Sequence, residues 1–109
     1  RQLLSRQERP DAIFGITDDL AIGAIEAIKE KGLNIPEDIA VVGFSNTKRS
    51  RYMNPTVSSI NQFPEKIGRA AAELLFDQIL NSKHAQIKKE IINCELIIRE
   101  SSDRLCKTR

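Results

Sequence analysis

The feature that most constrains the fold is a pair of short apolar runs on either side of one amphipathic stretch. Ala12–Ile16 and Ile39–Phe44 are continuous apolar runs, which is typical of strands buried on both faces of a parallel sheet. Between them, Leu20–Lys31 carries apolar residues at helical spacing, and Gly32 is a good helix stop. Strand, helix and strand in this order predict a βαβ unit whose two strands are parallel neighbours.

The rest of the chain adds fewer and weaker signals. Ser45–Pro55 is polar and is predicted to be irregular, and Val57–Ile60 is predicted to be a brief extended segment. Pro64–Leu80 is predicted to be the longest helix, because proline suits a first turn and apolar residues follow at helical spacing. Those residues form two stripes, which indicates a helix buried between layers or part of an interface. Glu90–Glu100 alternates like a final strand.

Charge and hydropathy exclude several classes of protein. The 109 residues include 17 basic and 15 acidic side chains, a net charge of +2. A dedicated nucleic-acid binder usually has a larger basic surplus gathered on one face. Because no apolar run approaches the roughly 20 residues of a membrane helix, no membrane association is expected. The chain lacks a signal peptide and starts at Arg1 rather than Met, so we interpret it as a fragment.

Catalytic and metal chemistry find little support in the sequence. Cys94 and Cys106 have no metal-ligand spacing and are expected to be free thiols of a reducing compartment. His84 is the only histidine and is expected at the surface. Asp18 and Asp19 are adjacent, so their side chains diverge at a helix start and do not form an acid/base pair. We therefore expect no enzyme, no metal and no cofactor.

Polar residues follow both predicted strands of the βαβ unit. Thr17 and Asp18 follow the first strand, and Ser45 and Asn46 follow the second. In open α/β sheets, ligands bind beyond the carboxyl ends of the strands. If the two strands are neighbours, the four side chains form a rim suited to a polar small molecule. Turn formation and helix capping alone explain these residues equally well.

Four blocks of sequence resemble LacI/GalR-type transcriptional regulators. Their order and spacing are more specific than any one block. The first block, residues 9–23, contains Pro-Asp-Ala-Ile-Phe and the Thr-Asp that follows it, and the second, residues 32–44, contains Ile-Pro-Glu-Asp-Ile-Ala-Val-Val-Gly-Phe. The third block, residues 55–75, contains Gln62 and Glu73-Leu74-Leu75. The fourth is the closing segment Glu-Leu-Ile-Ile-Arg-Glu-Ser, residues 95–101.

The resemblance implies part of a type I periplasmic-binding-protein-like core. Such a core is an α/β three-layer sandwich with a mostly parallel sheet and two lobes. Residues 1–101 are expected to be its C-terminal portion, and 102–109 a tail. Within it, 1–60 belong mainly to the C-terminal lobe, 61–90 to the hinge crossing and a helix of the N-terminal lobe, and 91–101 to the final strand.

The resemblance also implies which residues contact a ligand and which form a dimer. The expected ligand-binding residues are Thr17, Asp18, Ser45, Asn46, Gln62 and Phe63. The expected dimerisation surface consists of Ile22, Ile25, Glu26, Arg49, Arg51, Tyr52 and Met53. Ser45 takes the place of a family aspartate that often binds sugar hydroxyls, which weakens the case for a simple hexose.

Two functions follow as hypotheses. The first is the ligand-sensing and dimerising part of a cytoplasmic repressor of the LacI type, controlled by a small polar effector of the sugar or sugar-derivative class. Such a homodimer would bind operator DNA only through an N-terminal helix-turn-helix that this sequence does not contain. The alternative is a periplasmic sugar-binding receptor for transport or chemotaxis, which has the same fold.

Overall fold

A computed structural model describes residues 1–84 and 86–105, and they fall into two compact units. The first unit contains residues 1–61 and the chain from Leu96 onward, and the second contains residues 62–95. The predicted division at residue 60 lies one residue from this boundary, whereas the predicted final strand, 91–101, is shared between the units. The assignment of these segments to two lobes stays a prediction, and the tail beyond residue 105 lies outside the described residues.

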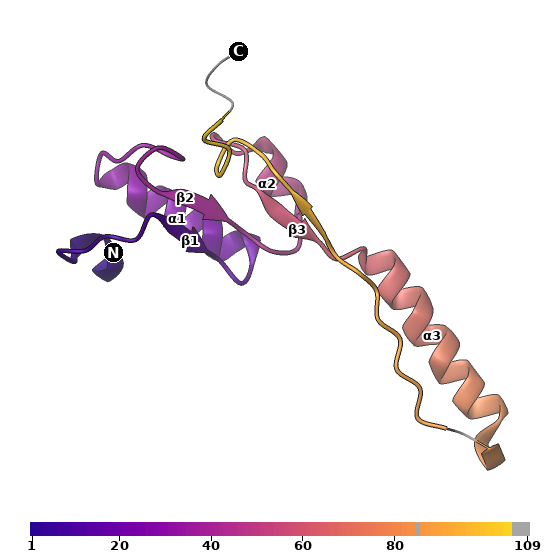
Figure 1. Cartoon of the computed structure of the whole chain (residues 1–109). Coiled ribbons are helices and arrows are strands. Elements are labelled where there is room, and N and C mark those ends of the chain that lie inside the picture. Colours follow the sequence, from indigo (N-terminus) through magenta and orange to yellow (C-terminus); the bar gives the residue numbers. More distant parts are fainter. Residues whose placement is uncertain (85, 106–109) are drawn as a thin grey trace. The chain divides into compact units, whose positions relative to one another are not determined.

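The first unit contains the predicted βαβ unit (Figure 1). A short 3-10 helix, η1 (Gln2–Ser5), precedes β1 (Ala12–Phe14), α1 (Asp18–Glu30) and β2 (Ala40–Val42). The two strands are parallel, with Ile13 opposite Val41. The strand–helix–strand prediction is therefore confirmed, although each strand is shorter than the apolar run that contains it.

The start of α1 depends on the side chain of Thr17. Its hydroxyl accepts a hydrogen bond from the Leu20 amide at 3.3 Å, which satisfies one of the free amides of the first turn. Asp18 and Asp19 follow in that turn, where a negative charge suits the helix dipole. Thr17 is thus the residue that caps α1.

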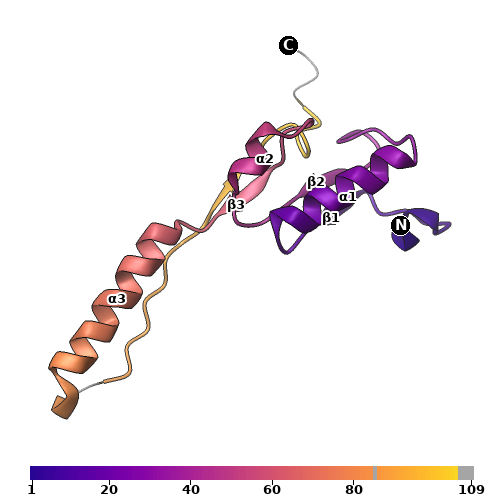
Figure 2. The same cartoon turned by 180° about the vertical axis from the view of Figure 1, so that it is seen from behind.

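One face of the β1–β2 pair is covered and the other is not. The buried core lies between these strands and α1, with Val57 added from the loop before β3. Phe14 is 55% exposed, and β1 contains no fully buried residue. The prediction that β1 is buried on both faces is therefore wrong here, because the part of the chain that the structure describes puts a helix against one face only (Figures 1 and 2). The third layer expected for the sandwich is not among these residues.

The polar stretch after β2 is more ordered than predicted. It forms α2 (Lys48–Tyr52), which sequence patterns do not predict because five residues are too few to show helical spacing. β3 (Ser59–Asn61) follows and pairs with β4 (Glu95–Ile97) in a two-stranded sheet. Ser58, just before β3, also forms a parallel bridge with Val42 at the end of β2, so the chain entering β3 runs in the same direction as β2.

Residues after β4 return to the core of the first unit. The buried Ser101 accepts a hydrogen bond from the Ser58 amide at 2.8 Å and donates one to the Val41 carbonyl at 2.6 Å. The Val41 amide in turn donates to the Ser101 carbonyl at 2.8 Å. Ser101 thereby contacts both β2 and the segment before β3, from which it is 60 and 43 residues away in sequence.

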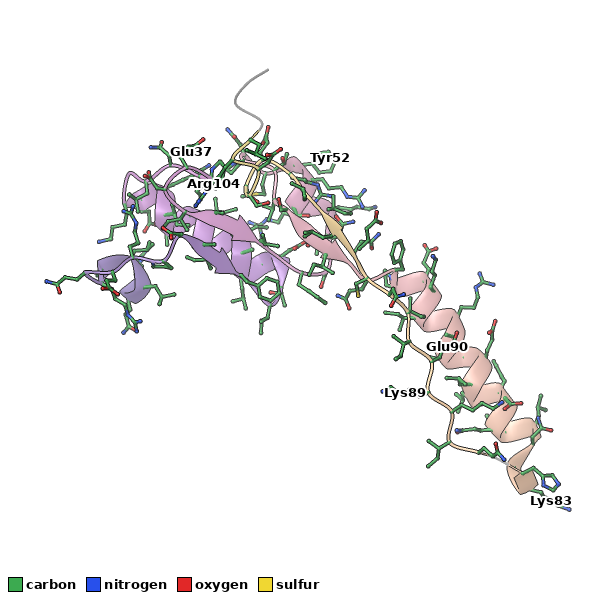
Figure 3. All side chains as sticks on the ribbon, in the orientation of Figure 1. Glu37, Tyr52, Lys83, Lys89, Glu90 and Arg104 are labelled. Atoms are coloured by element: carbon green, nitrogen blue, oxygen red, sulfur yellow. The ribbon has the colours of Figure 1, made fainter. Side chains whose placement is uncertain are left out.

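The second unit is built around one long helix. α3 (Pro64–Leu80) begins with proline, as predicted, and none of its residues is buried. A second 3-10 helix, η2 (Ser82–His84), follows it. The segment that includes Glu90 then runs back along α3 (Figure 3), and Ile91 and Ile92 line a hollow of about 400 Å³ against the helix.

The predicted final strand is largely absent. Only Glu95–Ile97 pairs as a strand, although apolar alternation extends from Glu90 to Glu100. A strand needs a neighbour for its backbone groups, and β3, its partner, is only three residues long. Among the residues described, no strand lies beside residues 90–94.

Candidate ligand site at the strand ends

The carboxyl ends of β1 and β2 lie side by side, as the sequence predicts. The Gly15 amide donates to the Val42 carbonyl at 2.8 Å, and the Asp18 amide donates to the Phe44 carbonyl at 2.9 Å. These two bonds join the turn that contains Thr17 to the turn that contains Ser45. The structure therefore brings together the four polar residues that follow the two strands.

Asp18 lies beneath this edge and is completely buried. One carboxylate oxygen accepts from the amide and the hydroxyl of Thr47, at 2.6 and 3.0 Å. The other accepts from the Ser59 hydroxyl at 2.5 Å. Both oxygens are satisfied within the protein, so this buried carboxylate is held by three donors, two from Thr47 before α2 and one from Ser59 in β3.

The Asp18 carboxylate fits only because residue 43 is glycine. A Cβ atom at Gly43 would lie 2.3 Å from an oxygen of Asp18, far inside van der Waals contact. The glycine of the Val-Val-Gly-Phe segment therefore leaves space for the start of α1. Close approach to another part of the chain, rather than turn formation, explains this glycine.

Ser45 and Asn46 form a sharp turn above Asp18. Both have positive φ, at 103° and 49°, a conformation that asparagine tolerates better than most residues. The Ser45 amide donates to the Ile60 carbonyl at 3.0 Å, and the Asn46 amide donates to the Ser59 hydroxyl at 2.9 Å. The turn is thus fixed from below by β3, with both side chains half-buried at the strand ends.

Arg99 supports the same turn and was not predicted. Its guanidinium donates to the side-chain oxygen of Asn46 and to the Val57 carbonyl, both at 2.7 Å. Burial lowers the pKa of Arg99, the positive charge of Arg51 adds to this effect, and Asp18 opposes it; arginine nevertheless stays charged in proteins. The only sequence signal for Arg99 was its place in the closing Ile-Ile-Arg-Glu-Ser block.

Thr47, Ser50 and Ser59 were also missed as site residues. Their roles depend on hydrogen bonds that form only in the folded chain, such as the one from Ser59 to Asp18, 41 residues away, so a single hydroxyl residue gives no pattern to read. Ser50 is completely buried and donates to the Thr47 carbonyl at 2.6 Å. No buried side-chain nitrogen or oxygen among the described residues lacks a partner, which indicates a fully paired polar cluster.

Gln62 and Phe63 belong to the second unit. Phe63 precedes α3 with a positive φ of 55°, and the ammonium of Lys66 lies 4.5 Å from the centre of its ring, a cation–π contact. Their expected contact with a ligand stays a prediction.

The predicted dimerisation surface needs a correction. Ile22 and Ile25 are only 2% and 0% exposed, because they face the core of the first unit rather than solvent. Met53 also packs partly against that core. Glu26, Arg49 and Arg51 are exposed, and Tyr52 projects from α2 with 86% of its surface accessible (Figure 3).

Other chemistries have no candidate site in the residues that the structure describes. They contain no group of three or more His, Cys, Asp or Glu side chains arranged to hold a metal. Cys94 is a free, exposed thiol, and Cys106 lies outside the described residues. None of the described helices is long and apolar enough to cross a membrane.

A parallel βαβ unit defines an α/β class of fold, and comparison with known proteins narrows this class to one family. Residues 1–102 match the periplasmic binding protein-like domain, so the chain belongs to that family. It is 40% identical over 102 residues to the HTH-type transcriptional repressor PurR of Mannheimia succiniciproducens, covering 92% of this chain and 30% of the relative. It is 37% identical to the repressor CytR of Escherichia coli K12, covering 94% and 30%.

Solved structures agree with this assignment. An uncharacterised protein from Actinobacillus succinogenes matches with a TM-score of 0.88 and 40% identity, over 94% of this chain and 38% of that one. The transcriptional regulator CelR in complex with cellobiose matches with a TM-score of 0.79 and 32% identity, over 84% and 28%. The chain therefore spans about 30% of the length of the curated relatives that it matches.

Proposed function

We propose that this chain is the C-terminal portion of the effector-binding core of a LacI-type transcriptional repressor. The observation that carries the proposal is the bond from the Asp18 amide to the Phe44 carbonyl, 2.9 Å long. It places two polar turns together at the strand ends, where open α/β sheets bind ligands. The relatives are named as transcriptional repressors, which favours this function over transport or catalysis.

The effector in this proposal is a small polar molecule of the sugar or sugar-derivative class. Thr17 is exposed and Ser45 and Asn46 are half-buried at the same edge, so each can offer a hydrogen bond. Asp18 holds the turns in place from below rather than touching the effector, because its oxygens already have three donors.

The rest of the proposal concerns the longer protein. Effector binding would shift an equilibrium between two arrangements of the core and so change the affinity of a helix-turn-helix for operator DNA. Glu26, Arg49, Arg51 and Tyr52 would contribute to a homodimer interface. Such a repressor acts in the cytoplasm and uses no cofactor in this scheme.

Calorimetry on the full-length protein tests the effector site. The panel contains ribose, cellobiose, sucrose and ribonucleosides, and we expect at least one to bind. Ser45→Ala should weaken that binding by about 1 kcal/mol, the value of one neutral hydrogen bond. Thr17→Ser, which keeps an oxygen to cap α1, should bind more tightly than Thr17→Ala.

The control is Ser5→Ala, which removes an exposed hydroxyl from η1 and should leave the affinity unchanged. Absence of binding across the whole panel would contradict the proposed effector class. Unchanged affinity in both Ser45→Ala and Thr17→Ala would show that the effector does not bind at these strand ends.

A further inference from the structure

Six residues of the first unit form a closed ring of hydrogen bonds under the proposed effector turn. We call this set the Asp18–Arg99 ring. From the Asp18 carboxylate, the ring passes through Thr47 and the Ser50 hydroxyl to the Arg99 guanidinium. It returns through the Asn46 side chain, the Asn46 amide and the Ser59 hydroxyl to the second oxygen of Asp18.

The links of the ring differ in length. Five of the six lie between 2.5 and 2.9 Å, the range of charge-assisted hydrogen bonds. The bond from Arg99 to the Ser50 hydroxyl is the longest, at 3.5 Å. A second route supports it, because Arg99 also donates to the Val57 carbonyl, and the Val57 amide donates to the Ser50 carbonyl at 2.8 Å.

The ring connects two features that the proposed function treats as separate. Asn46 lies in the turn proposed to contact the effector, and Ser50 lies in α2, which ends at the exposed Tyr52. Arg99 donates to both of them. Its planar guanidinium can hold two acceptors in fixed directions, which the single ammonium of lysine cannot do.

We propose that Arg99 is a positioning residue that holds Asn46 in its effector-contacting orientation and links that turn to α2. The effector in this proposal is the one assumed in the proposed function, on which this part of the proposal rests. The ring of hydrogen bonds is observed independently of that function. Arg99 itself does not contact the effector; it acts through Asn46. Loss of the guanidinium fork frees the Asn46 side chain and loosens the Ser45–Tyr52 segment together.

Hydrogen exchange on the full-length protein tests the ring without any ligand. Arg99→Lys keeps the charge but removes the fork, and we expect peptides covering Ser45–Tyr52 to exchange at least tenfold faster. Peptides covering the middle of α1 should exchange as in the parent protein. The matched control is Arg104→Lys, because Arg104 also donates to two backbone carbonyls, those of Pro36 and Asp11, outside the ring.

A double-mutant cycle with Asn46→Ala separates positioning from a general structural role. If Arg99 acts through Asn46, Arg99→Lys should weaken binding of the panel ligand about tenfold in the parent protein and hardly at all in the Asn46→Ala background. Additive effects would overturn the proposal, as would faster exchange across the whole first unit or unchanged exchange in Ser45–Tyr52.

The two readouts distinguish the two proposals. If no member of the sugar and nucleoside panel binds but Arg99→Lys accelerates exchange only in Ser45–Tyr52, the proposed effector class fails and the positioning role of Arg99 stands. If a panel member binds and the exchange pattern does not change, Arg99 has no positioning role and the proposed function stands.

Discussion

The two units of this chain use apolar residues in opposite ways. In the first, residues such as Ile25 and Val41 are completely buried, and polar side chains at the strand ends are paired in a ring. In the second, α3 has no buried residue, and Leu75, Phe76 and Ile79 are each more than half exposed. Both helices have an apolar stripe, so the stripe alone does not make a core; a second surface must lie against it.

The largest expected effect on stability tests this difference in packing directly. Ile25→Ala should cost about 3 kcal/mol of unfolding free energy, because it leaves a cavity in a closed core. Ile79→Ala, an equal truncation on the exposed face of α3, should cost less than about 1 kcal/mol in the 109-residue chain. Urea titration followed by circular dichroism measures both.

Equal costs for the two variants would show that the units do not differ in packing. The same pair of variants in the longer protein sharpens the comparison. A cost for Ile79→Ala there of more than about 2 kcal/mol would show that other residues cover α3.

A smaller effect on stability is expected at Gly43, which lies against the Asp18 carboxylate of the ring. Gly43→Ala should destabilise the first unit by about 2 kcal/mol, because the added Cβ would overlap the Asp18 carboxylate. Gly23→Ala is the matched control, since a Cβ there meets nothing within 4 Å on an exposed turn of α1. It should stabilise the protein by up to about 1 kcal/mol through helix propensity. Thermal unfolding that leaves Gly43→Ala as stable as the parent would contradict the close approach.

The smallest expected effect concerns acid. Hydrogen bonds from the Thr56 amide and hydroxyl lower the pKa of Glu100, and hydrogen bonds from Lys88 and Asn81 lower that of Asp77. A lowered pKa in the folded state stabilises the protein above the ordinary carboxyl pKa, and this stabilisation is lost as the pH falls below about 4. Glu100→Gln should therefore reduce stability more at pH 6 than at pH 3.

Asp77→Asn, in the second unit, should likewise reduce stability more at pH 6 than at pH 3. The two contacts differ in span: Glu100 joins residues 44 apart in sequence, whereas Asp77 joins residues 4 and 11 apart. A destabilisation by Glu100→Gln that is equal at both pH values would show that the Thr56 contact does not depend on the charge. Glu95→Gln, a change in an exposed carboxylate, serves as the control.

Local pattern was sufficient for part of the fold. The helix α1, the parallel pairing of β1 with β2 and the first residue of α3 all follow from spacing, pairing and capping rules. The strand prediction failed for residues 90–94, because alternating apolar residues form a strand only where a neighbouring strand pairs with their backbone. The family resemblance placed Ile22 and Ile25 in a dimer interface, and this failed because both side chains face the core of the first unit.

The sequence by itself determined the βαβ order, the family resemblance and the meeting of Thr17 and Asp18 with Ser45 and Asn46, since parallel neighbours end at the same edge. Only the tertiary structure decided that Asp18 is buried under three donors, and that Arg99 closes a ring with Asn46 and Ser50. The physical reason is range. Strand and helix periodicity arise from the backbone of neighbouring residues. A buried carboxylate and a guanidinium instead form hydrogen bonds with segments that are tens of residues away and become close only when the core packs.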